Sequence, residues 1–513
     1  MRTRLTIRRW DLVLLFGGIA VLAALLRFAF LDARTIHIDE GVSILYGQQI
    51  LGGTWLYNPF NAHGPVFFMF AAQVVRFFGT NVVAGRAAMG IVNLLWIGAL
   101  LWLYWPLLRN PGRLLLAAGL GLSSGLIFYS RYFIHEQLFM LITVGALAAA
   151  EMWVQRRRSW APATFIVLCA LLYSTKETAV FTVGAWAAAV ALLFLEPGRE
   201  KAIAELDWQN VLFGVALGAS LILLLFTQLF TDSTAVAHLF QGPLHWFDRA
   251  QAYHVRPFPY FLQLLVVHEY PLLLGALLLG WRLVVHRAWT PRLTFFALWT
   301  IFITLAYSWV PYKTPWCIPN LILPLGLFVA FAFDTLWPHV PEQWKQAWLL
   351  SVILLLGAGT ATAWADSIQH PDRVQPLDYA YLQSDKSFGR FLQTIQDISN
   401  LSQGPHPLPI QFIGEPDELL HVVTEPYATH EASEPLQPGL PLYINYMHDD
   451  MDTLQKIEDA SGKTYIRSTY RYLRDWGTLV DLFVEQDLWN RYLTDVAHED
   501  VQEGEHPVYD YSN

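Results

Sequence analysis

The sequence predicts an α-helical polytopic membrane protein with about eleven transmembrane helices and a C-terminal extracytoplasmic α/β domain. Three observations lead to this fold class. Hydrophobic residues make up 54% of the 513 residues and charged residues only 15%. In soluble proteins about a quarter of all residues are charged. Uncharged runs recur over the first 365 residues, and Lys and Arg gather in alternate loops between these runs.

The spans are predicted from apolar runs such as Leu12–Leu26 and Gly90–Leu108. Each run lies in a window close to the roughly 20 residues that a helix needs to cross hydrocarbon. The expected spans are residues 10–31, 83–106, 113–130, 137–155, 160–175, 178–195, 209–230, 266–286, 293–310, 318–337 and 346–365.

The basic residues predict the orientation, because loops rich in Lys and Arg stay on the cytoplasmic side. Basic residues precede the first span and return in every second loop: Arg2, Arg4, Arg8, Arg9; Arg109, Arg113; Arg156, Arg157, Arg158; Arg199, Lys201; Arg282, Arg287, Arg292; and Lys345. We therefore expect a multi-pass protein of the inner or plasma membrane, with its N-terminus in the cytoplasm and its C-terminal domain outside.

The composition changes near Ala365, which predicts two domains. Residues 1–365 form a membrane module with a long outer loop over 32–82, and residues 366–513 form a soluble acidic domain. This domain has 26 acidic and 9 basic residues, a net charge of 9 − 26 = −17, whereas the remainder carries 24 − 16 = +8. An acidic domain argues against a nucleic-acid partner. Strands are expected at 408–413 and 442–446, and helices at 387–398 and 452–460.

Two apolar segments are too short to cross the membrane, residues 66–78 and 258–267. We expect them at the membrane interface or re-entering it. The chain has only two cysteines, Cys169 and Cys317, which argues against a disulfide framework.

Ionisable residues are scarce within the spans but recur at their expected outer ends. Five outer segments supply these residues: the first holds His37, Asp39, Glu40 and His63, the second Arg131, His135 and Glu136, the third Lys176 and Glu177, the fourth His268 and Glu269, and the fifth Tyr312, Lys313 and Trp316. Burying such groups is costly unless they pair or bind a ligand, so we expect one cleft at the outer membrane surface.

Each residue also has a structural explanation. A carboxylate at a helix end can be a cap or a solvated loop residue. The histidines can be hydrogen-bonded structural residues, and the lysines can extend to the lipid headgroups. Recurrence across separate outer loops favours the shared cleft over these individual explanations.

Such a cleft suits sugar transfer from a lipid-linked phosphate. Arg131, Lys176 and Lys313 could neutralise the phosphate, and Asp39 could act as general base on an acceptor hydroxyl. Cations placed where negative charge develops would stabilise the departing lipid phosphate. The 21 Trp and 22 Tyr residues could stack on sugar rings, although membrane interfaces also use them.

The motifs resemble those of the GT-C glycosyltransferases, in the branch of the protein mannosyltransferases and lipid A aminoarabinose transferases. Within this branch they look like the subgroup named "flippase activity-associated protein". The resemblance rests on the order of five motifs over about residues 10–365: His37-Ile38-Asp39-Glu40, His63-Gly64-Pro65, Ser130 to Glu136, Ser174-Thr175-Lys176-Glu177 and Tyr312 to Trp316. The domain from Asp366 carries no matching motif.

The resemblance implies a transferase that uses a polyprenyl-phosphate sugar donor on the outer leaflet and inverts the anomeric carbon. Its catalytic acids would fall on Asp39, Glu40 and Glu136, where Glu136 replaces the Asp of many relatives. Arg131, Lys176 and Lys313 would hold the donor phosphate. His37, His63, His135, Glu177, Glu269, Tyr312 and Trp316 would line the substrate pocket. No metal or other cofactor is expected, although His37, Asp39 and His63 could form a divalent site.

The expected partners are the lipid-linked sugar donor, membrane lipids and an extracytoplasmic acceptor. The alternative is a flippase or transporter of lipid-linked sugars. A transporter would show ionisable residues near the bilayer midplane, or broken helices at matching places in two halves. The expected spans are nearly free of charge in their middles and show no two-fold repeat, which favours the enzyme.

Overall fold

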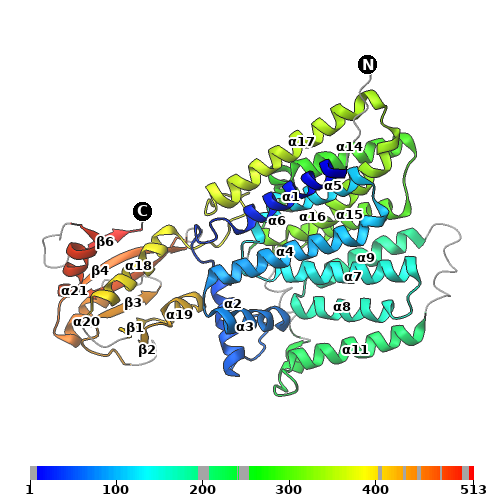
Figure 1. Cartoon of the computed structure of the whole chain (residues 1–513). Helices are drawn as coiled ribbons and strands as arrows, with labels where there is room; N and C mark the ends of the chain where they lie inside the picture. Colours follow the sequence, from blue (N-terminus) through cyan, green and yellow to red (C-terminus); the bar gives the residue numbers. More distant parts are fainter. Residues whose placement is uncertain are drawn as a thin grey trace. The chain divides into compact units, whose positions relative to one another are not determined.

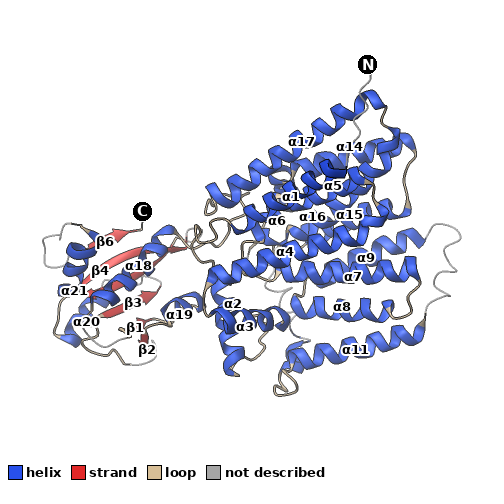
Figure 2. Ribbon diagram, in the orientation of Figure 1, coloured by secondary structure: helices blue, strands red, loops and turns tan. Residues whose placement is uncertain are grey.

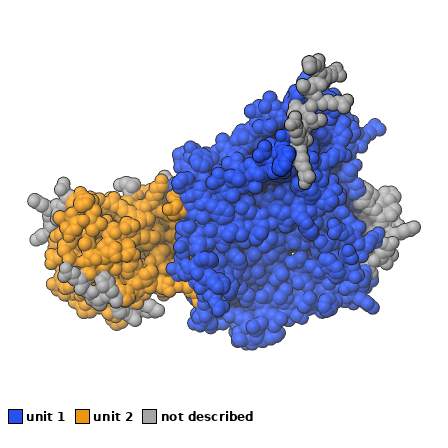
Figure 3. Space-filling view, viewed as in Figure 1, with its two compact units in different colours: residues 1–31, 49–379 blue, residues 32–48, 380–513 orange. Residues whose placement is uncertain are grey.

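The computed structural model describes residues 9–194, 207–239, 241, 254–402, 407–430, 435–446, 452–473, 477–499 and 508–512. The expected cytoplasmic residues Arg2, Arg4, Arg8, Arg199 and Lys201 lie outside this part. The chain divides into two compact units (Figure 3). Unit 1 comprises residues 1–31 and 49–379, and unit 2 comprises residues 32–48 and 380–513.

Unit 1 is built of helices (Figure 1). They are α1 (Arg9–Phe28), α3 (Pro65–Phe78), α4 (Val82–Tyr104), α5 (Asn110–Gly121), α6 (Ser124–Tyr129), α7 (Glu136–Arg156), α8 (Ala161–Thr175), α9 (Ala179–Phe194), α11 (Trp208–Phe226), α13 (Tyr260–His268), α14 (Tyr270–His286), α15 (Pro291–Trp309), α16 (Pro319–Leu336) and α17 (Glu342–Trp364). Figure 2 shows that helices and loops make up this unit.

The protein is a multi-pass membrane protein by the length and composition of these helices. In the described residues seven helices are long and apolar enough to cross a membrane, or up to eight if the bent pair α13 and α14 counts as one span. Helices α3, α8 and α9 are apolar but shorter. The predicted count of about eleven spans is therefore not confirmed. α16 is the innermost helix, since every residue except Thr335 is buried.

Two of the predicted spans are interrupted. The continuous span expected over 113–130 is wrong, because α5 ends at Gly121 and α6 begins at Ser124. Ser123 lies in an extended conformation, and its hydroxyl accepts a hydrogen bond from the Leu126 amide, which caps α6. The span expected from residue 266 is also bent, since α13 and α14 meet at 98° around Glu269.

Close helix contacts in unit 1 depend on small residues. A Cβ atom added to Gly214 of α11 would lie 2.7 Å from the Cα atom of Ala163 in α8, and Gly218 faces Ala170 in the same way at 3.2 Å. Membrane helices pack through such small residues because lipid supplies little hydrophobic driving force for their association.

Unit 2 is an α/β domain, as predicted. A six-stranded mixed sheet runs in the order β2-β1-β3-β5-β4-β6. Its strands are β1 (Pro409–Ile413), β2 (Ala428–His430), β3 (Leu442–Tyr446), β4 (Tyr465–Leu473), β5 (Thr478–Glu485) and β6 (Val508–Tyr511), and its helices are α18 (Lys386–Leu401), α19 (Glu418–Thr424), α20 (Asp452–Ser461) and α21 (Gln486–Tyr492). Apolar residues of the sheet and of α18 form its core.

The segment from Asp32 to Gln48 belongs to unit 2, although the sequence suggested only an outer loop of the membrane module. It contains most of α2 (Ile38–Gly52). Ile36 and Ile38 pack against the core of the sheet domain. The Gln383 amide donates to the Thr35 carbonyl oxygen at 2.9 Å, and a Cβ atom on Gly41 would lie 2.7 Å from a methyl carbon of Leu419. The first acidic motif is therefore held by the C-terminal domain.

Candidate functional site

An ion pair lies at the start of α7 and the end of α8. The Lys176 Nζ donates to Glu136 Oε1 at 2.5 Å, and both side chains are less than a tenth exposed. Burial disfavours the ammonium, but the Glu136 carboxylate outweighs it and raises the pKa of Lys176. Buried charges persist only when they are paired, so the Glu136 carboxylate keeps Lys176 charged.

Two histidines and a second carboxylate lie beside this pair. His63 Nδ1 and Glu177 Oε2 are 2.8 Å apart, and the His63 and His135 rings meet edge-on with centroids 5.0 Å apart. Burial, followed by the nearby His63 and Lys176, lowers the pKa of His135 well below its usual 6.5. His135 therefore remains neutral near pH 7. We call His63, His135, Glu136, Ser174, Lys176 and Glu177 the Lys176 cluster.

Several buried polar atoms of the Lys176 cluster have no hydrogen-bond partner in the described part of the chain. They are His135 Nε2, Ser174 Oγ and Glu177 Oε1. A buried polar atom without a partner costs about 1–3 kcal/mol, and native proteins keep few of them. Three such atoms in one cluster are typical of a site that a ligand or water completes.

The titration of His135 predicts a pH-dependent stability. Its pKa is lowered in the folded chain, so below about pH 6.5 the unfolded chain binds a proton that the folded chain does not, and stability falls with acidification. We expect His135→Asn to lose less stability than the wild type between about pH 7.5 and about pH 5.5. Thermal unfolding in detergent measures this difference. The exposed His421→Asn variant should behave as the wild type, and an undiminished loss in His135→Asn would contradict this role.

Gly64 explains why the His63-Gly64-Pro65 motif needs a glycine. A Cβ atom there would lie 2.2 Å from the Ser174 carbonyl oxygen. Two motifs far apart in sequence therefore touch through their backbones, which brings His63 to Glu177.

Gly64→Ala should destabilise the protein by at least about 1–3 kcal/mol, because the rigid backbone of Ser174 must move. The midpoint of thermal unfolding in detergent measures this loss. Gly98→Ala in α4 is the control, since its added Cβ meets nothing within 4 Å. Equal unfolding midpoints for the two variants would show that the contact is not needed.

Arg131 has a structural task in this structure. Its guanidinium donates to the carbonyl oxygens of Leu26, Arg27, Ala29 and Phe30 at 2.7–3.3 Å. The last carbonyls of a helix have no partner within the helix, so Arg131 caps the end of α1. This geometry does not favour the phosphate-binding role that the sequence suggested for it.

The last predicted motif folds against the segment before α13. The Lys313 amide donates to the His254 carbonyl oxygen at 3.0 Å, and the rings of Tyr312 and His254 meet edge-on. The Lys313 Nζ donates to the carbonyl oxygens of Val310 at 2.5 Å and Arg256 at 3.2 Å. Burial lowers the pKa of Lys313. Trp316 is buried. The two carbonyl oxygens hold the Lys313 ammonium in a fixed position.

Glu269 lies in a separate cluster that joins the two helix breaks. Its Oε1 accepts from the Ser123 hydroxyl at 2.8 Å and from the Gly125 amide at 2.6 Å, so it caps α6 from the bend between α13 and α14. The neighbouring His268 and Ser124 side chains both bond to Asp366 Oδ2.

Sequence reasoning missed the roles of Ser123, Ser124 and Asp366. The run Ser123-Ser124-Gly125 within an apolar stretch was the available signal, because these residues favour helix starts and turns.

The first acidic motif lies in unit 2. His37 Nε2 donates to the Tyr381 carbonyl oxygen at 2.8 Å, and its Nδ1 accepts from the Asp39 amide at 3.0 Å, so both ring nitrogens are bonded within unit 2. Glu40 is completely buried, accepts from the His37 amide at 2.9 Å and lies 3.8 Å from Arg34.

Asp39 differs from its neighbour Glu40. Its side chain is partly exposed, and among the described residues no hydrogen-bond or ion-pair partner of its carboxylate is found. Glu40 therefore stabilises the motif, whereas Asp39 has a carboxylate available for chemistry. Within the described residues no group of three His, Cys, Asp or Glu side chains could hold a metal ion, and metal dependence stays a prediction.

No protein-family model and no curated protein matches the chain. Solved structures do resemble it in fold. ArnT from Cupriavidus metallidurans bound to undecaprenyl phosphate has a TM-score of 0.59 at 16% identity, over 93% of this chain and 98% of that one. Its apo structure has a TM-score of 0.61 at 14% identity, over 92% and 97%. The Archaeoglobus fulgidus oligosaccharyltransferase has a TM-score of 0.52 at 13% identity, over 84% and 64%.

At these identities the likeness concerns the fold alone, and the GT-C fold expected from the motifs is confirmed. The narrower resemblance to the flippase activity-associated subgroup stays a prediction.

Proposed function

We propose that this chain is a membrane glycosyltransferase that moves a sugar from a polyprenyl-phosphate donor to an acceptor on the outer face of the membrane. The observation that carries the proposal is the Lys176 cluster, in which a buried ion pair adjoins three polar atoms that find no partner among the described residues. A chain with the GT-C fold and a polar, incompletely satisfied cluster at the ends of its helices is suited to bind a polar substrate beside lipid.

The donor is proposed from the chemistry of the cations and from a neighbour in fold. ArnT was crystallised with undecaprenyl phosphate, which suggests a polyprenyl phosphate here. The Lys313 ammonium has three donors, and backbone carbonyls hold two of them among the described residues. The third N–H is available for a phosphate oxygen, and the held position of the ammonium reduces the entropy lost on binding.

The proposed reaction is a single displacement at the anomeric carbon. Asp39 accepts the proton of the acceptor hydroxyl while the hydroxyl oxygen forms its bond to that carbon. The bond between the carbon and the phosphate oxygen breaks, the configuration inverts, and the lipid phosphate leaves with the negative charge. Lys313 and Lys176 stabilise this developing charge. The proposed role of Glu136 is to keep Lys176 charged.

Lys313→Gln should weaken binding of the lipid-phosphate donor about 10- to 100-fold, the usual loss for one hydrogen bond to a charged group, and should change acceptor binding less. Titration of purified protein with the polyprenyl-phosphate sugar measures this change. Lys345→Gln is the control, because this lysine pairs with exposed Glu342 at the start of α17. Unchanged donor affinity in Lys313→Gln would contradict the assignment.

A flippase of lipid-linked sugars is the second candidate, and the two helix breaks favour it because transporters often use broken helices. However, the Glu269 carboxylate at one break accepts hydrogen bonds from Ser123 and Gly125 at the other, and this holds the two breaks in place.

Mass spectrometry of cell-envelope glycans and lipid-linked sugars, with and without this protein, separates the two functions. Loss of one sugar unit with normal export of the donor supports the transferase. Accumulation of lipid-linked sugar on the cytoplasmic leaflet, with no missing unit after export is restored, supports the flippase.

A further inference from the structure

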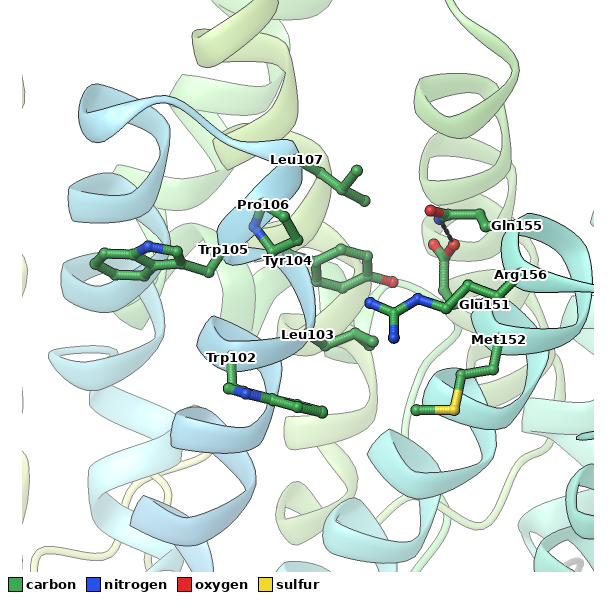
Figure 4. A pocket seen from close by; sticks show the side chains of 10 residues that line it. All are labelled: Trp102, Leu103, Tyr104, Trp105, Pro106, Leu107, Glu151, Met152, Gln155 and Arg156. Carbon is green, nitrogen blue, oxygen red and sulfur yellow. Dashed lines mark hydrogen bonds between the residues drawn. The ribbon is translucent and has the colours of Figure 1, made fainter. Parts of the chain in front are cut away.

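A second site lies at the other ends of α4 and α7, where both helices reach their C-termini. A pocket of about 560 Å³ is lined there by Trp102, Leu103, Tyr104, Trp105, Pro106, Leu107, Glu151, Met152, Gln155 and Arg156 (Figure 4). The Lys176 cluster lies at the N-terminus of α7, and this pocket lies at its last turn, so the two sites are separated by the length of that helix. None of the pocket residues has a part in the proposed transfer reaction.

Among the described residues that line this pocket Arg156 is the one cation, and its guanidinium points into the pocket (Figure 4). Within the described residues no hydrogen bond or ion pair of Arg156 is found. Helix α7 ends directly after it, because Arg157 adopts a left-handed conformation with φ 50°. Arg156 therefore offers its donors to a molecule in the pocket.

The acidic residue of the pocket is already neutralised. Glu151 lies 3.3 Å from Arg292 of α15 and accepts a hydrogen bond from the Gln155 amide. The rim carries a second cation, since the Arg113 guanidinium stacks 4.4 Å above the Trp105 ring. The pocket therefore favours an anion beside apolar walls.

The walls fit a lipid chain. Trp102 is 68% exposed and Trp105 43% exposed, and indoles in such positions are typical of the boundary between headgroups and hydrocarbon. Leu103, Leu107 and Met152 supply apolar surface next to the guanidinium. A phosphate bound by Arg156 would thus continue into an alkyl chain along the helices.

We propose that this pocket binds one anionic phospholipid, with its phosphate on Arg156 and an acyl chain against Trp102 and Met152. A bulk phospholipid is favoured over a scarce polyprenyl phosphate because the described residues supply the pocket with one lining cation. Occupancy of such a weak site requires a high ligand concentration, which only a bulk lipid has in a membrane. Arginine-rich ends of membrane helices are suited to anionic headgroups.

Native mass spectrometry of the delipidated full-length chain tests this proposal with added phosphatidylglycerol or phosphatidylcholine. We expect the wild type to retain one phosphatidylglycerol in preference to phosphatidylcholine. Arg156→Gln should weaken this binding about 10- to 100-fold. Arg158→Gln removes the same charge at the same end of α7 outside the pocket, and it should bind as the wild type. Met152→Trp should also weaken binding, because the larger side chain fills the apolar wall.

Three results would overturn the proposal. The first is equal phosphatidylglycerol binding by the wild type and Arg156→Gln. The second is equal retention of phosphatidylcholine, which would leave no role for net anionic charge. The third is displacement of phosphatidylglycerol from the wild type by equimolar undecaprenyl phosphate, which would identify the pocket as a polyprenyl-phosphate site. If Arg156→Gln fails to fold, Met152→Trp with the same lipids decides the question.

Discussion

Asp39→Asn is expected to lower the rate of sugar transfer about 100- to 10,000-fold, the usual contribution of a general base. Asparagine has nearly the same shape but cannot accept the proton of the acceptor hydroxyl. The Asp39 carboxylate lacks a partner among the described residues, so its replacement should leave unit 2 folded. Transfer of sugar from a polyprenyl-phosphate donor by purified protein measures the rate.

Asp32→Asn is the matched control, because Asp32 lies in the same segment and is exposed. It should transfer sugar at the wild-type rate. The thermal unfolding of Asp39→Asn should equal that of the wild type, which separates a chemical defect from a folding defect. Transfer at the wild-type rate by Asp39→Asn would exclude Asp39 as the base.

Glu136→Gln is expected to destabilise the protein by about 3–5 kcal/mol, because it leaves the Lys176 ammonium buried without a counter-charge. The loss should appear as a lower midpoint of thermal unfolding in detergent. The same variant should also reduce transfer: without Glu136 burial lowers the pKa of Lys176, and a lysine that has lost its proton cannot stabilise the leaving phosphate.

The double variant Glu136→Leu with Lys176→Met tests the coupling. Replacing both charges by apolar residues should restore much of the stability, because buried ion pairs add little to stability over apolar substitutes. Transfer should remain low, since the ammonium is gone. Glu342→Gln removes one partner of an exposed pair and should change the unfolding midpoint little. A double variant as unstable as Glu136→Gln would contradict a direct interaction.

Prediction from sequence worked where one local property decides the structure. Apolar length predicted the membrane helices, because hydrocarbon demands apolar side chains and internal hydrogen bonds whatever the tertiary packing. The strands expected at 408–413 and 442–446 correspond to β1 and β3. The prediction of continuous spans failed at Ser123 and Glu269, where the helices are interrupted. There the Glu269 carboxylate accepts a hydrogen bond from the Gly125 amide, so a side chain from another helix bonds to the backbone at the break.

The candidate site was predicted as a set of residues, and the structure sorted the set. His63, His135, Glu136, Lys176 and Glu177 come together, Arg131 caps α1, and Glu269 braces two helix breaks. Sequence cannot distinguish these tasks, because each arginine or glutamate is the same chemical group until its partners are fixed.

The sequence by itself determined that the chain crosses a membrane, that an acidic α/β domain follows, and that acids and cations recur at the helix ends. Only the tertiary structure decided that residues 32–48 fold with the C-terminal domain and that Glu40 is buried while Asp39 is partly exposed. It also decided that the backbone of the Gly64 motif contacts the backbone of the Ser174 motif. The physical reason is distance along the chain. Composition acts residue by residue, whereas the contacts of Thr35 with Gln383, Gly41 with Leu419 and Gly64 with Ser174 join segments more than a hundred residues apart.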